Sequence, residues 1–276
     1  MNRSVFSPVT GAAVVMALLG GCATADQPGA ETSSEPGTLA LRANGEDFVR
    51  QGFVTKDGWQ INFDHVYVSL ADVKAYQTSP PFDADAEAAL EAEAEVPLVK
   101  AETVDLAAGD AEAEPILVTQ VEAPAGQYNA LSWEMVPASE GPAAGQVLML
   151  VGTAEKAGET VDFTLKFDQP YAYVCGDFVG ENRKGILEPA DSADVEATFH
   201  FDHIFGDGEA APEAEINTGA LGFEPIAALA TDQQVEADLA ALEQQLASED
   251  YAQLQTALQG LAHVGEGHCR ATEVTS

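Results

Sequence analysis

Basic residues are scarce in this chain, and their scarcity limits its partners. Lysine and arginine together number 11 in 276 residues, against 46 aspartates and glutamates, which gives a formal net charge of −35. Such a chain repels the phosphates of nucleic acids and the headgroups of an anionic membrane surface. Both partners are therefore excluded, and divalent cations are the expected counterparts. Most of the carboxylates are expected to form a solvated surface, because they are scattered along the whole chain.

Catalytic motifs are absent as well. The sequence contains no Gly-x-Ser-x-Gly, no phosphate-binding loop, no His-Glu-x-x-His and no dinucleotide fingerprint. With so many carboxylates, any chosen acidic pair carries no information about acid–base chemistry. We therefore expect a binding or structural protein and not an enzyme.

Long hydrophobic runs are also missing, apart from one short run near the amino terminus. Val9 to Leu19 follows the positive Arg3 and is too short to span a bilayer stably. The run ends in Leu19-Gly20-Gly21-Cys22, which resembles the lipobox of bacterial lipoproteins. This resemblance implies that residues 1–21 are a signal peptide and that Cys22 is lipidated. Ala23 after the cysteine then implies the outer membrane, facing the periplasm; the alternative is an ordinary secretory signal in which Cys22 is incidental.

Composition divides the rest of the chain into three parts. Residues 22–37 are rich in Gly, Ser, Thr, Pro and Glu, and predict a flexible tether. Residues 38–230 contain many short β-like runs separated by Gly and Pro turns, so we predict a mainly β fold, an antiparallel β-sandwich or open barrel. An Ala-, Asp- and Glu-rich run at 82–95 reads as an insertion in this domain. Leucines at helical spacing over residues 231–276 predict an α-helical hairpin and a tail packed on the same domain.

Cysteine is rare, with three in the chain. Apart from Cys22, only Cys175 and Cys269 remain, and an oxidising periplasm favours a disulfide between them. The alternative is thiolate ligation of a metal, with His268 beside Cys269. No paired Cys-x-x-Cys of a structural zinc site is present.

The five histidines include two in a repeated motif. Phe63-Asp64-His65 returns as Phe201-Asp202-His203, and both copies read as β-strands. Strand alternation then places each histidine on the face opposite its aspartate. His200 shares a face with Asp202, and His203 lies on the other face.

These positions predict a metal site made from two equivalent strands and the tail. We expect His65 and His203 to converge, with His268 or His263 arriving from the disulfide-anchored tail, and imidazole suits zinc or copper. A second arrangement uses His200, Asp202 and Asp64. The alternative function is a cell-envelope structural or interaction module, in which the histidines only satisfy hydrogen bonds in the core and no metal is bound.

Three segments also resemble a group of bacterial lipoproteins without an established activity. They are residues 58–68 around the first motif, residues 197–207 around the second, and the tail Gly265-Glu266-Gly267-His268-Cys269. The resemblance implies attachment to the membrane through the lipid anchor and identifies no protein partner. A looser similarity to periplasmic β-sandwich proteins linked to copper handling maps no ligand motif onto this chain.

Overall fold

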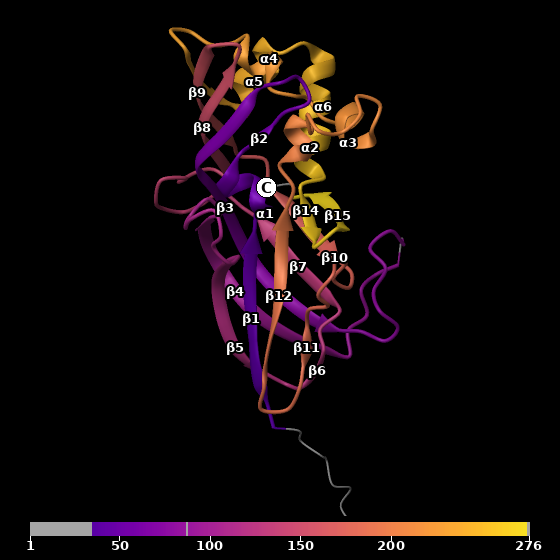
Figure 1. Cartoon of the computed structure of the whole chain (residues 1–276). Coiled ribbons are helices and arrows are strands. Elements are labelled where there is room, and N and C mark those ends of the chain that lie inside the picture. The colour runs from indigo at the N-terminus through magenta and orange to yellow at the C-terminus, as the bar shows by residue number, and fades with distance from the viewer. Residues whose placement is uncertain (1–34, 87, 275–276) are drawn as a thin grey trace, which may run out of the picture. The chain divides into compact units, whose positions relative to one another are not determined.

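One strongly curled sheet is the framework of the part of the chain that the structure describes (Figure 1). The computed structural model describes residues 35–86 and 88–274. The predicted signal peptide, Cys22 and most of the predicted tether lie outside these ranges. The described residues from Glu35 onward belong to one compact unit.

The strands and helices have the following bounds. The strands are β1 (Gly37–Asn44), β2 (Phe53–Val54), β3 (Gln60–Gln77), β4 (Ala94–Asp105), β5 (Ile116–Ala123), β6 (Gly126–Gln127), β7 (Ala130–Met135), β8 (Leu148–Lys156), β9 (Glu159–Phe167), β10 (Tyr171–Cys175), β11 (Ile186–Leu187), β12 (Ser192–Phe199), β13 (Gln234–Asp238), β14 (Ala262–Val264) and β15 (Gly267–Glu273). The helices are α1 (Glu46–Gln51), α2 (Asp202–Phe205), α3 (Glu215–Gly219), α4 (Glu224–Ala227), α5 (Leu239–Gln245) and α6 (Ser248–Gln259).

The sheet is mixed and curls into a half-barrel, which corrects the predicted antiparallel sandwich and is nearer to the predicted open barrel. Thirteen strands run mainly in the order β13-β9-β8-β3-β7-β10-β15-β14-β12-β1-β5, with β2 and β4 also paired to β3. Strands β1 and β12 pair in parallel, as do β9 and β13, whereas the other neighbours are antiparallel. The mainly β class is confirmed. Long connections bring strands that are distant in the sequence side by side in the sheet. Local alternation of polar and apolar residues does not reveal such pairings.

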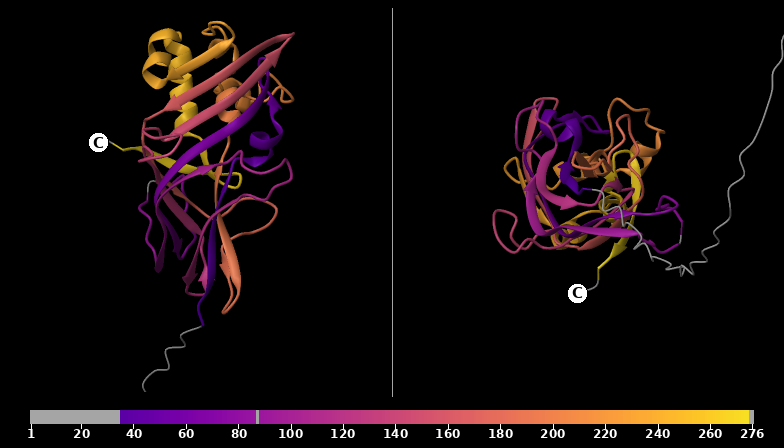
Figure 2. Two further views of the ribbon diagram at one scale, coloured as in Figure 1. Left: turned by 90° about the vertical axis from the view of Figure 1, so that its left-hand side faces the viewer. Right: turned by 90° about the horizontal axis from the view of Figure 1, so that it is seen from below.

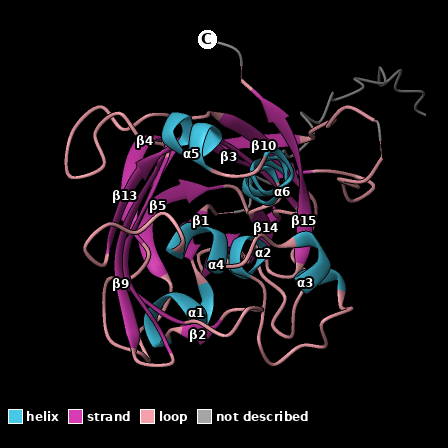
Figure 3. Cartoon of the chain, turned by 90° about the horizontal axis from the view of Figure 1, so that it is seen from above, coloured by secondary structure: helices cyan, strands magenta, loops and turns pink. Residues whose placement is uncertain are grey.

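Most of the helices lie at one end of the curled sheet (Figures 2 and 3). The sheet and these helices enclose an interior of buried hydrophobic side chains. The ring of Phe223 packs edge to face with Trp59 and tilted against Phe163, with a centroid distance of 5.4 Å in each pair. Helix α6 buries Leu254, Ala257 and Leu258 against this interior. The hydroxyl of Tyr173 on β10 donates to the Leu258 carbonyl, so α6 is fixed to the sheet by both packing and a hydrogen bond.

The carboxyl-terminal helical hairpin predicted for residues 231–276 is not formed. Helix α6 lies where the leucine spacing indicates, but residues 234–238 form strand β13, in which Val235 pairs with Phe163. Val235 and Ala237 are buried alternately, so a two-residue period fits this segment as well as a helical one. Asp238 then caps the short α5 by accepting a hydrogen bond from the Ala241 amide. The last two strands that the structure describes, β14 and β15, form a β-hairpin.

A disulfide joins Cys175 to Cys269, as predicted, and ties the tail to the sheet. The two cysteines are directly opposite each other on the neighbouring strands β10 and β15. The next residue, Arg270, donates to the carbonyls of Ala86 and Ala88 and lies over the ring of Phe82. The described residues of the acidic segment 82–95 run mainly as a loop between β3 and β4, and Arg270 of β15 holds that loop through these contacts.

In the described portion of the chain, the helices are too short or too polar for any of them to cross a membrane.

We predict that the disulfide contributes measurably to the free energy of unfolding. Replacing both Cys175 and Cys269 by alanine should lower the free energy of unfolding by about 2–4 kcal/mol, since the bond closes a long loop in the unfolded chain. The separation of the two residues is 94 positions. Urea unfolding of the metal-free protein measures the loss. Reducing agent should lower the midpoint of the parent protein and leave that of the double variant unchanged, and equal midpoints for parent and variant would contradict the prediction.

Candidate functional site

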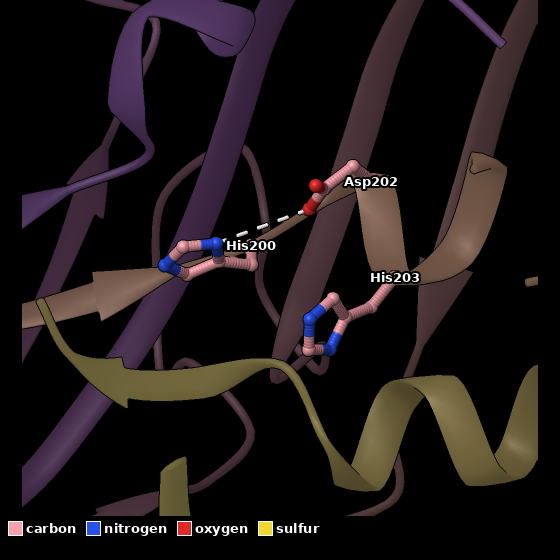
Figure 4. A group of neighbouring side chains, drawn as sticks. All are labelled: His200, Asp202 and His203. Carbon is pink, nitrogen blue, oxygen red and sulfur yellow. Dashed lines mark ion pairs between the residues drawn. The ribbon is translucent and has the colours of Figure 1, made fainter. Parts of the chain in front are cut away.

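The second Phe-Asp-His motif lies on a helical turn and not on a strand. Strand β12 ends at Phe199, and α2 begins at Asp202. The prediction that this copy of the motif lies on a β-strand is therefore wrong, and so is the predicted separation of His203 from His200 and Asp202. Because the chain turns, ligand atoms of His200, Asp202 and His203 all lie within 4.8 Å of one another (Figure 4).

The first motif lies elsewhere, on β3, where a β-bulge changes its alternation. The pairing of β3 with β8 shifts register between Phe63 and His65, so Asp64 is the extra residue. Val66 consequently points inward, and Asp64 and His65 are both exposed. His65 Nδ1 lies 2.7 Å from an Asp105 carboxylate oxygen, and its ring stacks on Tyr67. His65 and Asp64 are not members of the group formed by His200, Asp202 and His203.

The carboxyl-terminal β-hairpin brings two more histidines to that group. His263 on β14 pairs with Thr198 of β12 on one side and with His268 of β15 on the other. The turn between β14 and β15 requires Gly265, whose φ is 61°. A β-carbon there would lie 2.0 Å from the Val179 carbonyl oxygen, so no other residue fits this turn without a shift.

Four histidines and one aspartate thus form what we name the histidine cluster: His200, Asp202, His203, His263 and His268. The ring centroid of His263 lies 4.1 Å from that of His200, 4.9 Å from that of His203 and 4.4 Å from that of His268. His263 is therefore at the centre. Its side chain and that of His200 are deeply buried, with 3% and 6% exposed, whereas His268 is exposed.

Backbone carbonyls fix the protonation of two rings. His200 Nε2 donates to the Gly265 carbonyl over 3.2 Å, and His203 Nδ1 donates to the Gly260 carbonyl over 3.0 Å. Each hydrogen bond assigns the proton to one ring nitrogen. The lone pairs of His200 Nδ1 and His203 Nε2 therefore remain available, and His200 Nδ1 lies 3.9 Å from an Asp202 oxygen. Metal-binding histidines typically have this arrangement.

Other polar atoms of the cluster lack partners. Neither ring nitrogen of His263 has a hydrogen-bond partner among the described protein atoms, and the same holds for Asp202 Oδ1. These atoms are buried, and an unsatisfied buried polar atom costs about 1–3 kcal/mol. Buried polar atoms of this kind are suited to contact with an ion or an ordered water.

Burial also decides the charge of the central rings. It lowers the pKa of His263 to about 3, and the neighbouring histidines add to the effect. The pKa of His203 is lowered by burial too, although Asp202 opposes the shift. Both rings are consequently neutral near pH 7, which is the form that binds metals.

Glu46 is a further acidic neighbour that the sequence does not reveal. One of its carboxylate oxygens lies 3.7 Å from His200 Nε2, and burial raises its pKa. Its backbone has a φ of 58°, which is uncommon for a non-glycine residue. Glu46 lies far from His200 in the sequence and belongs to no motif, so only the parallel pairing of β1 with β12 brings it here.

The predicted site residues thus fall into two sets. The structure brings together His203 and His268 from the first predicted arrangement with His200 and Asp202 from the second, and adds His263 at the centre. It leaves His65 and Asp64 outside the cluster. Cys269 is in the disulfide, so the alternative of thiolate ligation is not formed.

Together, fold and cluster define a β-rich protein with a partly buried group of histidines and a carboxylate. No protein-family model, curated protein or solved structure matches this chain.

The depressed pKa of His263 predicts acid sensitivity of the metal-free protein. In the unfolded chain a histidine takes up a proton near pH 6.5, but in the folded protein His263 does so only near pH 3. Its contribution to stability is therefore present above pH 6.5 and is lost as the pH falls toward 3. Urea unfolding in chelator between pH 7 and 4 should show a shallower loss for His263→Leu than for the parent. Parallel pH profiles would contradict this prediction.

Proposed function

We propose that the histidine cluster binds a divalent transition metal, zinc or copper. The observation that carries this proposal is the convergence of His200, Asp202 and His203, whose ligand atoms lie within 4.8 Å of one another beside the buried ring of His263. In this group, Asp202 Oδ1 has no hydrogen-bond partner among the described protein atoms. Neutral imidazole is a preferred ligand of zinc and of copper, and a carboxylate completes many such sites. His200, Asp202 and His203 supply the first three ligands, because their ligand atoms already converge.

The neighbouring backbone supports the same assignment. The carbonyls of Gly260 and Gly265 orient His203 and His200 and leave one lone pair on each ring for the ion. Such outer partners raise the basicity of the ligand and hold its ring in place.

Electrostatics also favours a cation. The chain has a formal net charge of −35. Glu46 lies next to His200, and Glu266 on the turn between β14 and β15 is near enough to Glu46 to help raise its pKa. A negative potential around a cleft increases the local concentration of cations.

The alternative function, an envelope interaction module with structural histidines, explains less of this arrangement. It accounts for His200 and His203, whose rings are bonded to carbonyls, and for the surface pair of His65 with Asp105. It gives no reason for the convergence of ligand atoms from His200, Asp202 and His203, or for a buried Asp202 oxygen without a hydrogen-bond partner among the described protein atoms. We therefore place metal binding first.

Two features bear on the cellular location of the protein: the lipobox-like segment and the disulfide. We propose that the chain is anchored through Cys22 at the outer membrane and faces the periplasm. The lipobox-like segment and the Cys175–Cys269 disulfide support this location, because disulfides persist in oxidising compartments.

Metal analysis of the untagged chain tests the function. After reloading with Zn²⁺ or Cu²⁺ and dialysis, we expect one equivalent of tightly bound metal. His200→Ala and His203→Ala should each weaken binding by roughly 100-fold or more, since each removes a direct ligand and even outer partners contribute 10–100-fold. Inductively coupled plasma mass spectrometry gives the stoichiometry, and competition with a chelator gives the affinity.

His65→Ala is the matched control. It removes a histidine from the other copy of the same motif, outside the cluster, and should leave the affinity within about twofold of the parent, as expected for a distant site. A parent protein that retains no metal would overturn the proposal. Equal losses in His65→Ala and His203→Ala would also contradict the assignment of ligands.

A further inference from the structure

A cleft of about 410 Å³ opens directly beside the histidine cluster. Its lining includes His203 and His268, the Ile216 and Gly219 side of α3, and Ala257 of α6. His203 thus belongs both to the convergent group with His200 and Asp202 and to the wall of the cleft. An ion held by His203 therefore lies at the end of a space that reaches the solvent.

The three convergent protein ligands leave a coordination position of the metal ion open. His200, Asp202 and His203 are the group whose ligand atoms come together within 4.8 Å. Metal sites with three protein ligands and one open position exchange small molecules, whereas sites closed by four protein ligands do not. Neither the buried His263 nor the exposed His268 is a member of that convergent group, so a fourth position stays open to a ligand from the cleft.

The shape and charge of the cleft restrict the molecule that it can accept. Its volume is within the range of about 300–1,000 Å³ that is usual for small-molecule sites. Ile216, Ala257 and Gly219 make part of the wall apolar or small, and the carboxylate of Glu215 stands at the same wall. In a chain with a net charge of −35, a negatively charged ligand is disfavoured.

We propose that the metal centre takes a small neutral ligand from this cleft, a molecule with one nitrogen donor and a compact apolar body of the azole type. The donor occupies the open coordination position, and the apolar body lies against α3 and α6. This inference rests on the proposed metal binding and adds the class of ligand to it.

Titration of the copper-loaded full chain with imidazole tests the inference. We expect a saturable shift of the visible copper absorption with one imidazole bound and the copper retained. Azide, a small anionic ligand of copper, should bind at least about tenfold more weakly. A repulsion of only about 1.4 kcal/mol between the anion and the acidic protein produces a tenfold difference in affinity.

Gly219 offers a variant that blocks the cleft without touching the cluster. A β-carbon at this position meets no atom within 4 Å, so Gly219→Leu places its side chain in open space. It should weaken imidazole binding by about tenfold or more and leave copper affinity unchanged, since crowding in a pocket of this kind has effects of that size. Thr256→Leu, at another point of the lining, is the second variant, and Ala252→Leu on the exposed face of α6 is the matched control.

The outcomes separate the two proposals. A copper-loaded protein whose spectrum does not change at high imidazole would show that the chain closes the coordination sphere itself, and only this inference would fail. Release of copper to imidazole, or equal binding by parent and both cleft variants, would overturn it as well. Failure of the parent to load metal would overturn the metal-binding function and this inference together.

Discussion

The pairing of β14 between β12 and β15 is the contact on which the structure depends most. In the order of the sheet, these two short strands join the half that contains β5, β1 and β12 to the half that runs from β10 to β13. The same pairing places His263 beside Thr198 and opposite His268. The continuity of the curled sheet and the assembly of the histidine cluster therefore depend on the same strand pairings.

The cluster is a polar group inside an apolar surrounding. Phe201, between His200 and Asp202 in the sequence, is fully buried and packs against Phe63, with ring centroids 6.1 Å apart. These aromatic rings exclude water from one side of the cluster. Ring nitrogens without a hydrogen-bond partner are therefore energetically costly there, and electrostatic interactions with an ion are stronger than in water. On the other side lies the cleft beside His203 and His268. The cluster is thus dry at its inner end and accessible at its outer end.

Some of this could be predicted from the sequence, and the failures have definite physical causes. Strand composition predicts a mainly β protein, and the rarity of cysteine predicts the Cys175–Cys269 bond. The repeated Phe-Asp-His motif suggests two equivalent strands, but a bulge at Asp64 exposes His65, and a helical turn at Asp202 gathers the second copy. Both are local departures from a two-residue period, which the sequence pattern does not mark. Parallel pairing and the approach of Glu46 are long-range effects, so no local pattern reveals them.

The disulfide has a role in the cluster beyond its contribution to stability. Cys269 and His268 are consecutive residues on β15, so their side chains point to opposite faces of the sheet. One face carries the bond to Cys175, and the other directs His268 toward His263. A slip of β15 by one residue would reverse every side chain and turn His268 away from the cluster. The bond to β10 prevents that slip and so fixes the register that the cluster requires. The adjacency of His268 and Cys269 therefore has a structural reason, although Cys269 is in a disulfide and is not a metal ligand.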